Sequence, residues 1–237
     1  MMKIGLLAAG VTPDALQPQY PTYAQMFALQ LQAYEASFEF VTYDVRLGEF
    51  PASSSDCDAW LITGSKADAY GDEDWILRLC DLIQDIDRNG QVLVGICFGH
   101  QIIARALGGK VEKYQGGWGV GVHQYQVQQT IPTLPQTQTL SLCAFHQDQV
   151  VEKPAKLTTF LSSPFCQHAG LVYADKILTF QGHPEFSKQY EGDLLQLYAG
   201  VTVPDDIVAK AQQSLVENSI DSPQLMAWIA QFLKGTH

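Results

Sequence analysis

The sequence has no Cys-x-x-Cys pair, although it contains five cysteines in 237 residues. An odd number of widely spaced cysteines predicts neither a disulfide framework nor a zinc site. This usage is typical of a protein that stays in the reducing cytoplasm. The cysteines are Cys57, Cys80, Cys97, Cys143 and Cys166.

Basic residues are also scarce. The chain has 14 lysines and arginines against 25 aspartates and glutamates, which gives a formal net charge of −11. Because scattered acidic side chains repel phosphate backbones and anionic membranes, we do not expect nucleic-acid binding. Long apolar runs are missing too, and the apolar stretch at residues 1–10 is short. We therefore expect neither a signal peptide nor a membrane span.

The first hundred residues alternate between short apolar runs and segments with helical spacing. Helical patterns occur at residues 23–34 and 73–88, and 46% of the whole chain is hydrophobic. Strands that alternate with helices predict an α/β fold with a mostly parallel central sheet covered on both faces. The strands are expected at residues 3–8, 38–43, 59–62 and 92–94.

The pattern changes after residue 110 to shorter strands, which we expect to pair in an antiparallel or mixed manner. Near the end of the chain it returns to helices. We predict that residues 1–190 form one α/β domain with a small antiparallel element. Residues 191–237 are predicted to be a helical C-terminal extension packed on the same domain. The strands are expected at 120–127, 139–145, 157–161, 170–173 and 176–180, and the helices at 190–198, 205–217 and 224–233.

Cys97 lies on a predicted tight turn from a strand to a helix. Gly95 and Gly99 flank it at two residues on either side and remove side chains that would crowd such a turn. Unpaired N–H groups at a helix start, together with the helix dipole, favour a thiolate over a thiol. The alternative is that Cys97 is a small buried hydrophobic residue at a packing corner. The first hypothesis is a reactive cysteine.

A cysteine nucleophile gains most from a histidine that takes its proton and is held by a third group. His183 follows a predicted strand, and Glu185 is close enough to orient its ring, although a single histidine before proline is often a surface residue. His146 ends another strand and could line the same cleft. His100 lies inside the helix, where we expect a structural role. The histidines have no metal-binding spacing, and we expect no metal site.

Two strings together resemble the class I glutamine amidotransferases. They are Gly-x-Cys-x-Gly-His-Gln around Cys97 and, later in the chain, His-Pro-Glu starting at His183. The resemblance implies a flavodoxin-like fold and a Cys-His-Glu triad without a cofactor. It implies that Cys97 attacks the γ-carboxamide of glutamine, that His183 protonates the departing ammonia, and that Glu185 holds and polarises His183.

The resemblance also implies which residues surround the substrate. Backbone N–H groups would stabilise the oxyanion, and a few side chains would shape the glutamine pocket. The oxyanion turn departs from the common Gly-Gly-Pro of the family, because this sequence has Thr-Gly-Ser-Lys at residues 63–66. The implied binding residues are Gly64, Ser65 and Phe98 for the oxyanion, and Gln101, His146 and Gln147 for the substrate.

Free-standing members of this family are similar to the glutaminase domain of GMP synthetase and include γ-glutamyl peptidases. The resemblance therefore implies a cytoplasmic thiol hydrolase that cleaves the γ-glutamyl amide bond of glutamine. The alternatives are a γ-glutamyl peptidase acting on γ-glutamyl conjugates and a catalytically idle binding or regulatory subunit. The segment after the triad is too short for a fused synthetase, so any ammonia acceptor would be a separate synthetase. The helices after residue 190 leave self-association into a homo-oligomer open.

Overall fold

The computed structural model describes residues 1–129, 131 and 137–235. In this part of the chain, nine strands form one sheet. In order across the sheet they are β2 (Phe38–Tyr43), β1 (Met2–Leu7), β3 (Ala59–Ile62), β4 (Val92–Ile96), β11 (Ile177–Phe180), β10 (Gly170–Tyr173), β9 (Thr158–Ser162), β6 (Gly119–Val127) and β7 (Thr139–His146).

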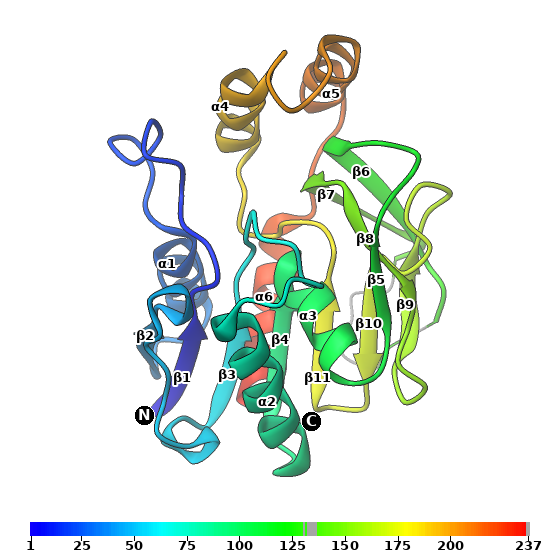
Figure 1. The fold of residues 1–237 in the computed structure, drawn as a ribbon. Helices are drawn as coiled ribbons and strands as arrows, with labels where there is room; N and C mark the ends of the chain where they lie inside the picture. Colours follow the sequence, from blue (N-terminus) through cyan, green and yellow to red (C-terminus); the bar gives the residue numbers. More distant parts are fainter. Residues whose placement is uncertain (130, 132–136, 236–237) are drawn as a thin grey trace.

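Helices cover both faces of the parallel half of this sheet, which consists of β2, β1, β3, β4 and β11. The helices are α1 (Tyr23–Tyr34), α2 (Asp74–Arg88), α3 (Phe98–Ala106), α4 (Lys188–Tyr198), α5 (Asp205–Glu217) and α6 (Ser222–Lys234), and short 3₁₀ turns occur at Val45–Leu47 and Ser54–Asp56. In Figure 1, α2 and α3 lie in front of the parallel strands, α1 and α6 cover the opposite face, and α4 and α5 lie beyond the carboxyl ends of the strands.

The sequence of β3 is apolar throughout, and all four of its residues are buried. Leu61 belongs to the core cluster that α1 and α6 complete, whereas Trp60 and Ile62 belong to the cluster that α2 and α3 complete. Successive side chains of a strand point to opposite faces, so a strand covered on both sides needs apolar residues at every position. The expected α/β fold with a mostly parallel core and flanking helices is confirmed.

The antiparallel strands β10, β9, β6 and β7 continue the same sheet beyond β11. The segment expected at 176–180 is β11, which pairs parallel to β4 with Phe180 opposite Ile96. Two further strands, β5 (Lys110–Lys113) and β8 (Asp148–Glu152), form a separate antiparallel pair that the sequence did not predict. Three of the four residues of β5 are charged, so it lacks the apolar alternation of a half-buried strand.

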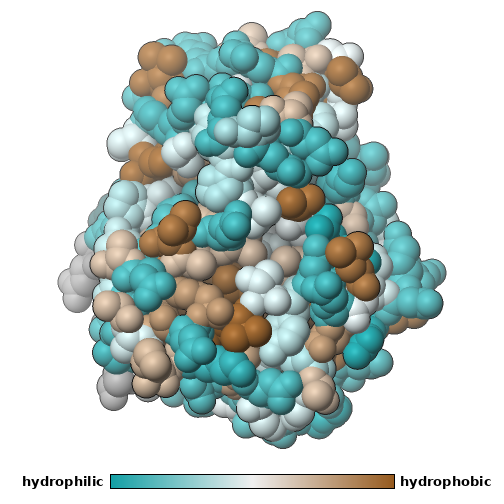
Figure 2. All heavy atoms as spheres, turned by 90° about the vertical axis from the view of Figure 1, so that its left-hand side faces the viewer, coloured by the Kyte–Doolittle hydropathy of each residue, from teal (hydrophilic) through white to brown (hydrophobic). Residues whose placement is uncertain are grey.

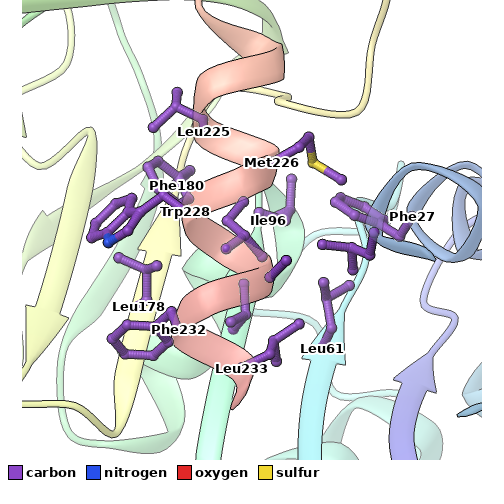
Figure 3. Packing of buried hydrophobic residues seen from close by; sticks show 14 of the residues in the cluster. Phe27, Leu61, Ile96, Leu178, Phe180, Leu225, Met226, Trp228, Phe232 and Leu233 are labelled. Atoms are coloured by element: carbon purple, nitrogen blue, oxygen red, sulfur yellow. The ribbon is translucent and has the colours of Figure 1, made fainter. Parts of the chain in front are cut away.

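The helix α6 covers the back of β4, the strand that leads to Cys97. Figure 3 shows Trp228 and Leu233 of α6 among apolar residues from the sheet. The Trp228 ring lies edge-on to Phe160 and Phe180, with centroid distances of 5.7 and 5.9 Å. The helix ends at Gly235, whose φ of 64° is a left-handed conformation that glycine adopts easily. Residues 236 and 237 of the predicted C-terminal extension lie outside the described residues.

The outer surface mixes polar and apolar side chains. On the face turned toward the viewer in Figure 2, hydrophobic groups lie among more numerous hydrophilic ones. Exposed apolar residues such as Leu29 and Leu47 belong to separate elements, so they do not by themselves make a binding patch. None of the helices in the described part of the chain has the length and apolar character that a membrane crossing requires.

Candidate active site

Cys97 occupies the sharp turn between β4 and α3. Its φ of 52° and ψ of −103° lie outside the helical and extended regions, which is uncommon for a residue that is not glycine. Such a conformation typically costs about 1–3 kcal/mol and persists only where the surroundings enforce it. Here the Cys97 N–H donates to the Phe180 carbonyl at 2.8 Å, and the Gln101 N–H donates to the Cys97 carbonyl at 3.0 Å. The turn is therefore fixed from β11 and from α3.

Two glycines make this turn sterically feasible. A Cβ on Gly99 would stand 2.4 Å from the carbonyl oxygen of Ile62, and one on Gly95 would stand 2.6 Å from the carbonyl oxygen of Gly99. Real Cβ atoms do not approach backbone atoms so closely, so only glycine lets α3 start against β3 and β4. The sequence interpretation of these glycines agrees with this close approach.

The parallel pairing of β11 with β4 brings His183 to the same edge of the sheet as Cys97. The chain leaves β11 at Phe180 and reaches His183, whose N–H donates to the carbonyl of Cys143 in β7 at 2.8 Å. A Cβ on Gly182 would lie 3.1 Å from the same carbonyl oxygen. The histidine backbone is thereby held between the parallel and antiparallel parts of the sheet.

The side chains of Cys97, His183 and Glu185 lie together in one buried group. His183 Nδ1 lies 2.8 Å from Glu185 Oε1, and the exposed fractions of the two residues are 4% and 3%. A carboxylate can only accept, so Nδ1 carries the proton and Nε2 is the nitrogen left to interact with Cys97. Burial opposes protonation of His183, but Glu185 and Cys97 together raise its pKa well above the usual value.

The turn after β3 covers this pair. A Cβ on Gly64 would lie 3.0 Å from His183 Cε1 and 3.7 Å from Cys97 Cβ. Thr63 holds the turn to the segment after β1, because its hydroxyl accepts from the Ala9 N–H at 3.1 Å. The predicted oxyanion turn thus lies directly beside the candidate nucleophile and its histidine.

This packing leads to a testable expectation for Gly64→Ala. The added methyl group would press on His183 Cε1, and the ring cannot move freely because Glu185 holds the adjacent Nδ1. We expect kcat to fall by about 10- to 100-fold, since small misplacements of reacting groups cost rates of this order. Steady-state kinetics measures the loss and thermal unfolding provides the control. An unchanged kcat in a stable variant would show that the site accommodates the added methyl group without displacing the His183 ring.

The remaining predicted binding residues lie around the start of β8. Gln101 is buried, and its side-chain amide donates to the Asp148 carbonyl at 2.8 Å and to Gln181 Oε1 at 3.1 Å. His146 is buried as well, with Nδ1 3.1 Å from the same carbonyl oxygen, and burial lowers its pKa to about 3. Gln147 is partly exposed and accepts a backbone hydrogen bond from Tyr114. Gln101 therefore anchors this segment through its amide, and its predicted substrate contact stays a prediction.

His100 does not face the thiol as a partner. Its Nδ1 lies 2.7 Å from the Thr179 hydroxyl in β11, and burial lowers its pKa to about 3. A neutral, fully buried histidine bonded to a sheet residue agrees with the structural role expected from the sequence. In the part of the chain that the structure describes, no three His, Cys, Asp or Glu side chains are grouped so that they could hold a metal ion.

Sequence reasoning missed a second buried glutamate near the triad. Glu191 in the first turn of α4 is fully buried, and its Oε1 accepts from the Gly121 N–H at 3.0 Å. Burial raises the pKa of Glu191 to about 8, and the nearby Glu185 adds to this shift, although the Gly121 hydrogen bond and His183 oppose it. An acidic residue in a first helical turn is usually solvent-exposed, so no sequence signal marked it.

The shifted pKa of Glu191 predicts a pH effect on stability. The unfolded chain loses the Glu191 proton near the ordinary pKa of 4.5, whereas the folded protein keeps it up to about pH 8. Between these values the unfolded state binds fewer protons, so the free energy of unfolding falls as pH rises. The Glu191→Gln side chain cannot ionise, so the free energy of unfolding of this variant should fall less between about pH 5 and pH 8. The difference from the parent should be about 1.4 kcal/mol for each unit by which folding raises the pKa of Glu191. Urea unfolding of both proteins measures this; equal losses would contradict the assignment.

The chain is similar to known proteins in both sequence and fold. The family model described as glutamine amidotransferase class-I matches residues 19–196. Gamma-glutamyl peptidase 2 of Arabidopsis thaliana is 32% identical over 79% of each chain, and gamma-glutamyl peptidase 4 of the same plant is 28% identical over 94% of this chain and 92% of its own. The crystal structure of a glutamine amidotransferase from Thermotoga maritima superposes with a TM-score of 0.75 over 99% of both chains at 17% identity, which shows the shared fold.

Proposed function

This chain belongs to the class I glutamine amidotransferase family, and we propose that it is a thiol hydrolase of γ-glutamyl amide bonds with Cys97, His183 and Glu185 as its catalytic residues. The observation that supports this most is the buried group of Cys97, His183 and Glu185, in which Glu185 and His183 share a 2.8 Å hydrogen bond and Cys97 lies at the carboxyl ends of the parallel strands. Ligands of open α/β sheets bind at this edge.

In the proposed reaction, Cys97 transfers its proton to His183 Nε2 and its sulfur attacks the γ-carbonyl carbon. Backbone N–H groups at Phe98 and in the Gly64–Ser65 turn would stabilise the oxyanion. His183 then gives its proton to the leaving amine, which departs as the carbonyl re-forms in a γ-glutamyl thioester. Water, deprotonated by His183, hydrolyses the thioester and regenerates the thiol. Glu185 keeps the imidazole in the required tautomer throughout.

Glutamine is the proposed substrate, and a γ-glutamyl peptide or conjugate is the second candidate. The second candidate is favoured by the similarity to several gamma-glutamyl peptidases of Arabidopsis thaliana, which extends over most of both chains. The chemistry at the acyl group is the same for both, because only the leaving amine differs. A catalytically idle subunit with the family fold is the remaining alternative, and the buried grouping of Cys97, His183 and Glu185 argues against it.

A substrate panel tests these alternatives. We would measure release of glutamate and of ammonia or amine from glutamine, from γ-glutamyl dipeptides and from a glutathione conjugate, at equal concentrations. A higher kcat/KM for glutamine supports the amidotransferase type, and a higher value for the peptides supports the peptidase. No turnover of any compound above the Cys97→Ser background would refute the proposed hydrolase and leave the idle subunit.

We further propose that the ammonia passes to a separate synthetase or is released. One similar protein is the GMP synthase [glutamine-hydrolyzing] of Macrococcus caseolyticus, which is 31% identical over 110 residues, 45% of this chain and 21% of that protein.

A cytoplasmic location is proposed because the five cysteines of this sequence are all free. Residues 1–190 are proposed as the catalytic domain, with the helices of 191–237 packed on it and homo-oligomer formation left to a measurement of native mass.

A further inference from the structure

The imidazole of His183 lies flat on the ring of Phe186. The two ring centroids are 4.0 Å apart and the planes differ by 7°, so the rings are parallel and in contact. Phe186 is 2% exposed, which means that water does not separate or screen the pair. The face of His183 is therefore covered by an aromatic ring, while Glu185 is hydrogen-bonded to Nδ1 and Cys97 interacts electrostatically with the imidazole.

A phenyl face stacked on an imidazole stabilises the charged form of the imidazole more than the neutral form. The face of a phenyl ring carries partial negative charge, so two neutral aromatic rings prefer edge-to-face or offset arrangements. A cation placed over the same face within about 6 Å is attracted, and the attraction grows when the site is desolvated. Protonated His183 would be such a cation, because its ring is stacked on the face of Phe186.

Resting on the proposed function, we propose that Phe186 is a positioning residue that stabilises the protonated imidazole of His183 and thereby the thiolate of Cys97. The step is a proton transfer within the pair: the S–H bond of Cys97 breaks, and an N–H bond forms at His183 Nε2. The product is a thiolate beside an imidazolium, and Phe186 lowers the energy of this form relative to the neutral thiol and imidazole.

Two tyrosines hold Phe186 in its place. The Phe186 ring lies 5.6 Å from the ring of Tyr23 in α1 and 4.5 Å from that of Tyr190 in α4. The Tyr190 hydroxyl donates to the Tyr23 hydroxyl at 3.3 Å, and burial raises the pKa of both tyrosines above the ordinary value. Phe186 is thus backed by neutral phenols from two helices and cannot tilt away from the histidine.

Charged and titratable side chains face His183 from its own loop and from α3, α1, β7 and α4. Glu185 of the loop and Cys97 at the start of α3 favour the charged imidazole. The remaining groups are neutral near neutral pH, so they do not compete with Phe186 for the charged imidazole. The other groups near His183 are Tyr23 of α1, Cys143 and His146 of β7, and Tyr190 and Glu191 of α4.

The test is the rate at which iodoacetamide alkylates Cys97, followed by mass spectrometry of the labelled peptide. This rate reports the thiolate and requires no γ-glutamyl substrate. For Phe186→Leu we expect alkylation near neutral pH to slow by about 3- to 30-fold, the range that corresponds to a desolvated cation–π contact. Phe160→Leu, which removes an equally buried ring that packs on Phe180 and Trp228, should leave the rate unchanged.

A second series keeps the ring and changes only its charge distribution. Phenylalanine at position 186 is replaced by its 4-fluoro, 3,5-difluoro and pentafluoro forms, which progressively remove negative charge from the ring face. The proposal predicts a graded slowing of alkylation in this order. Rates that are insensitive to fluorination, equal rates in Phe186→Leu and Phe160→Leu, or a parent protein whose Cys97 is not alkylated would each overturn it. A protein that hydrolyses none of the panel but shows the graded rates would refute the proposed function and leave this inference standing.

Discussion

Replacing Cys97 by serine is expected to lower kcat for the preferred γ-glutamyl substrate by at least about 10⁴-fold. A serine hydroxyl at this position would have to lose a proton that it holds far more tightly than a thiol does, even though the raised pKa of His183 favours its accepting that proton. The substitution keeps the shape of the side chain, so the strained turn at φ 52° should form as before.

The matched control for this variant is Cys80→Ser. Cys80 is a buried cysteine of α2 that does not belong to the triad, and its replacement should change kcat by less than about twofold because it removes no reacting group. Urea unfolding shows whether either variant is destabilised. A Cys97→Ser protein that keeps more than about one hundredth of the parent activity would exclude Cys97 as the nucleophile.

Glu185→Gln is expected to lower kcat by about 10³- to 10⁴-fold. The amide is neutral and can present an N–H group to His183 Nδ1, so it neither fixes the tautomer nor stabilises the imidazolium that forms in the reaction. The parent contact is a 2.8 Å hydrogen bond inside the protein, where loss of a charged partner is not compensated by water. KM should change much less than kcat, because Glu185 supports a charge that develops during the reaction.

The control for this second variant is Glu191→Gln. Both glutamates are buried within one short segment, but burial and Glu185 raise the pKa of Glu191 to about 8, so near neutral pH it is already uncharged. Its replacement by glutamine should therefore leave kcat within about threefold of the parent value. Similar losses in both variants would mean that the site depends on general packing of this segment and not on the carboxylate of Glu185.

Local sequence signals located many of the helices accurately. The helix expected at 23–34 has these bounds in the structure because Thr22 and Gln25 form a capping box that fixes its start. The helix expected at 205–217 also has these bounds, since it begins directly after Pro204. The last helix starts earlier than the expected residue 224, because Pro223 lies inside its first turn, where proline is tolerated.

The pairing of distant segments was much harder to predict. The strands β5 and β8 stabilise each other across the 34 residues between Lys113 and Asp148, and neither has a strong pattern of its own. For the site, the strings around Cys97 and His183 identified candidates, whereas the flat contact of Phe186 and the burial of Glu191 depend on how α1, α4 and β6 come together. Such contacts arise from tertiary packing, which short sequence patterns do not encode.

The most direct test of the account is covalent labelling with a glutamine-derived electrophile, followed by mapping of the modified peptide by mass spectrometry. The account predicts one label per chain, on Cys97, with loss of activity in proportion to labelling and protection by the preferred substrate. The label should be absent from Cys97→Ser. Labelling spread over Cys57, Cys80, Cys143 or Cys166, or full activity in a protein labelled at Cys97, would contradict the assignment of Cys97 as the nucleophile.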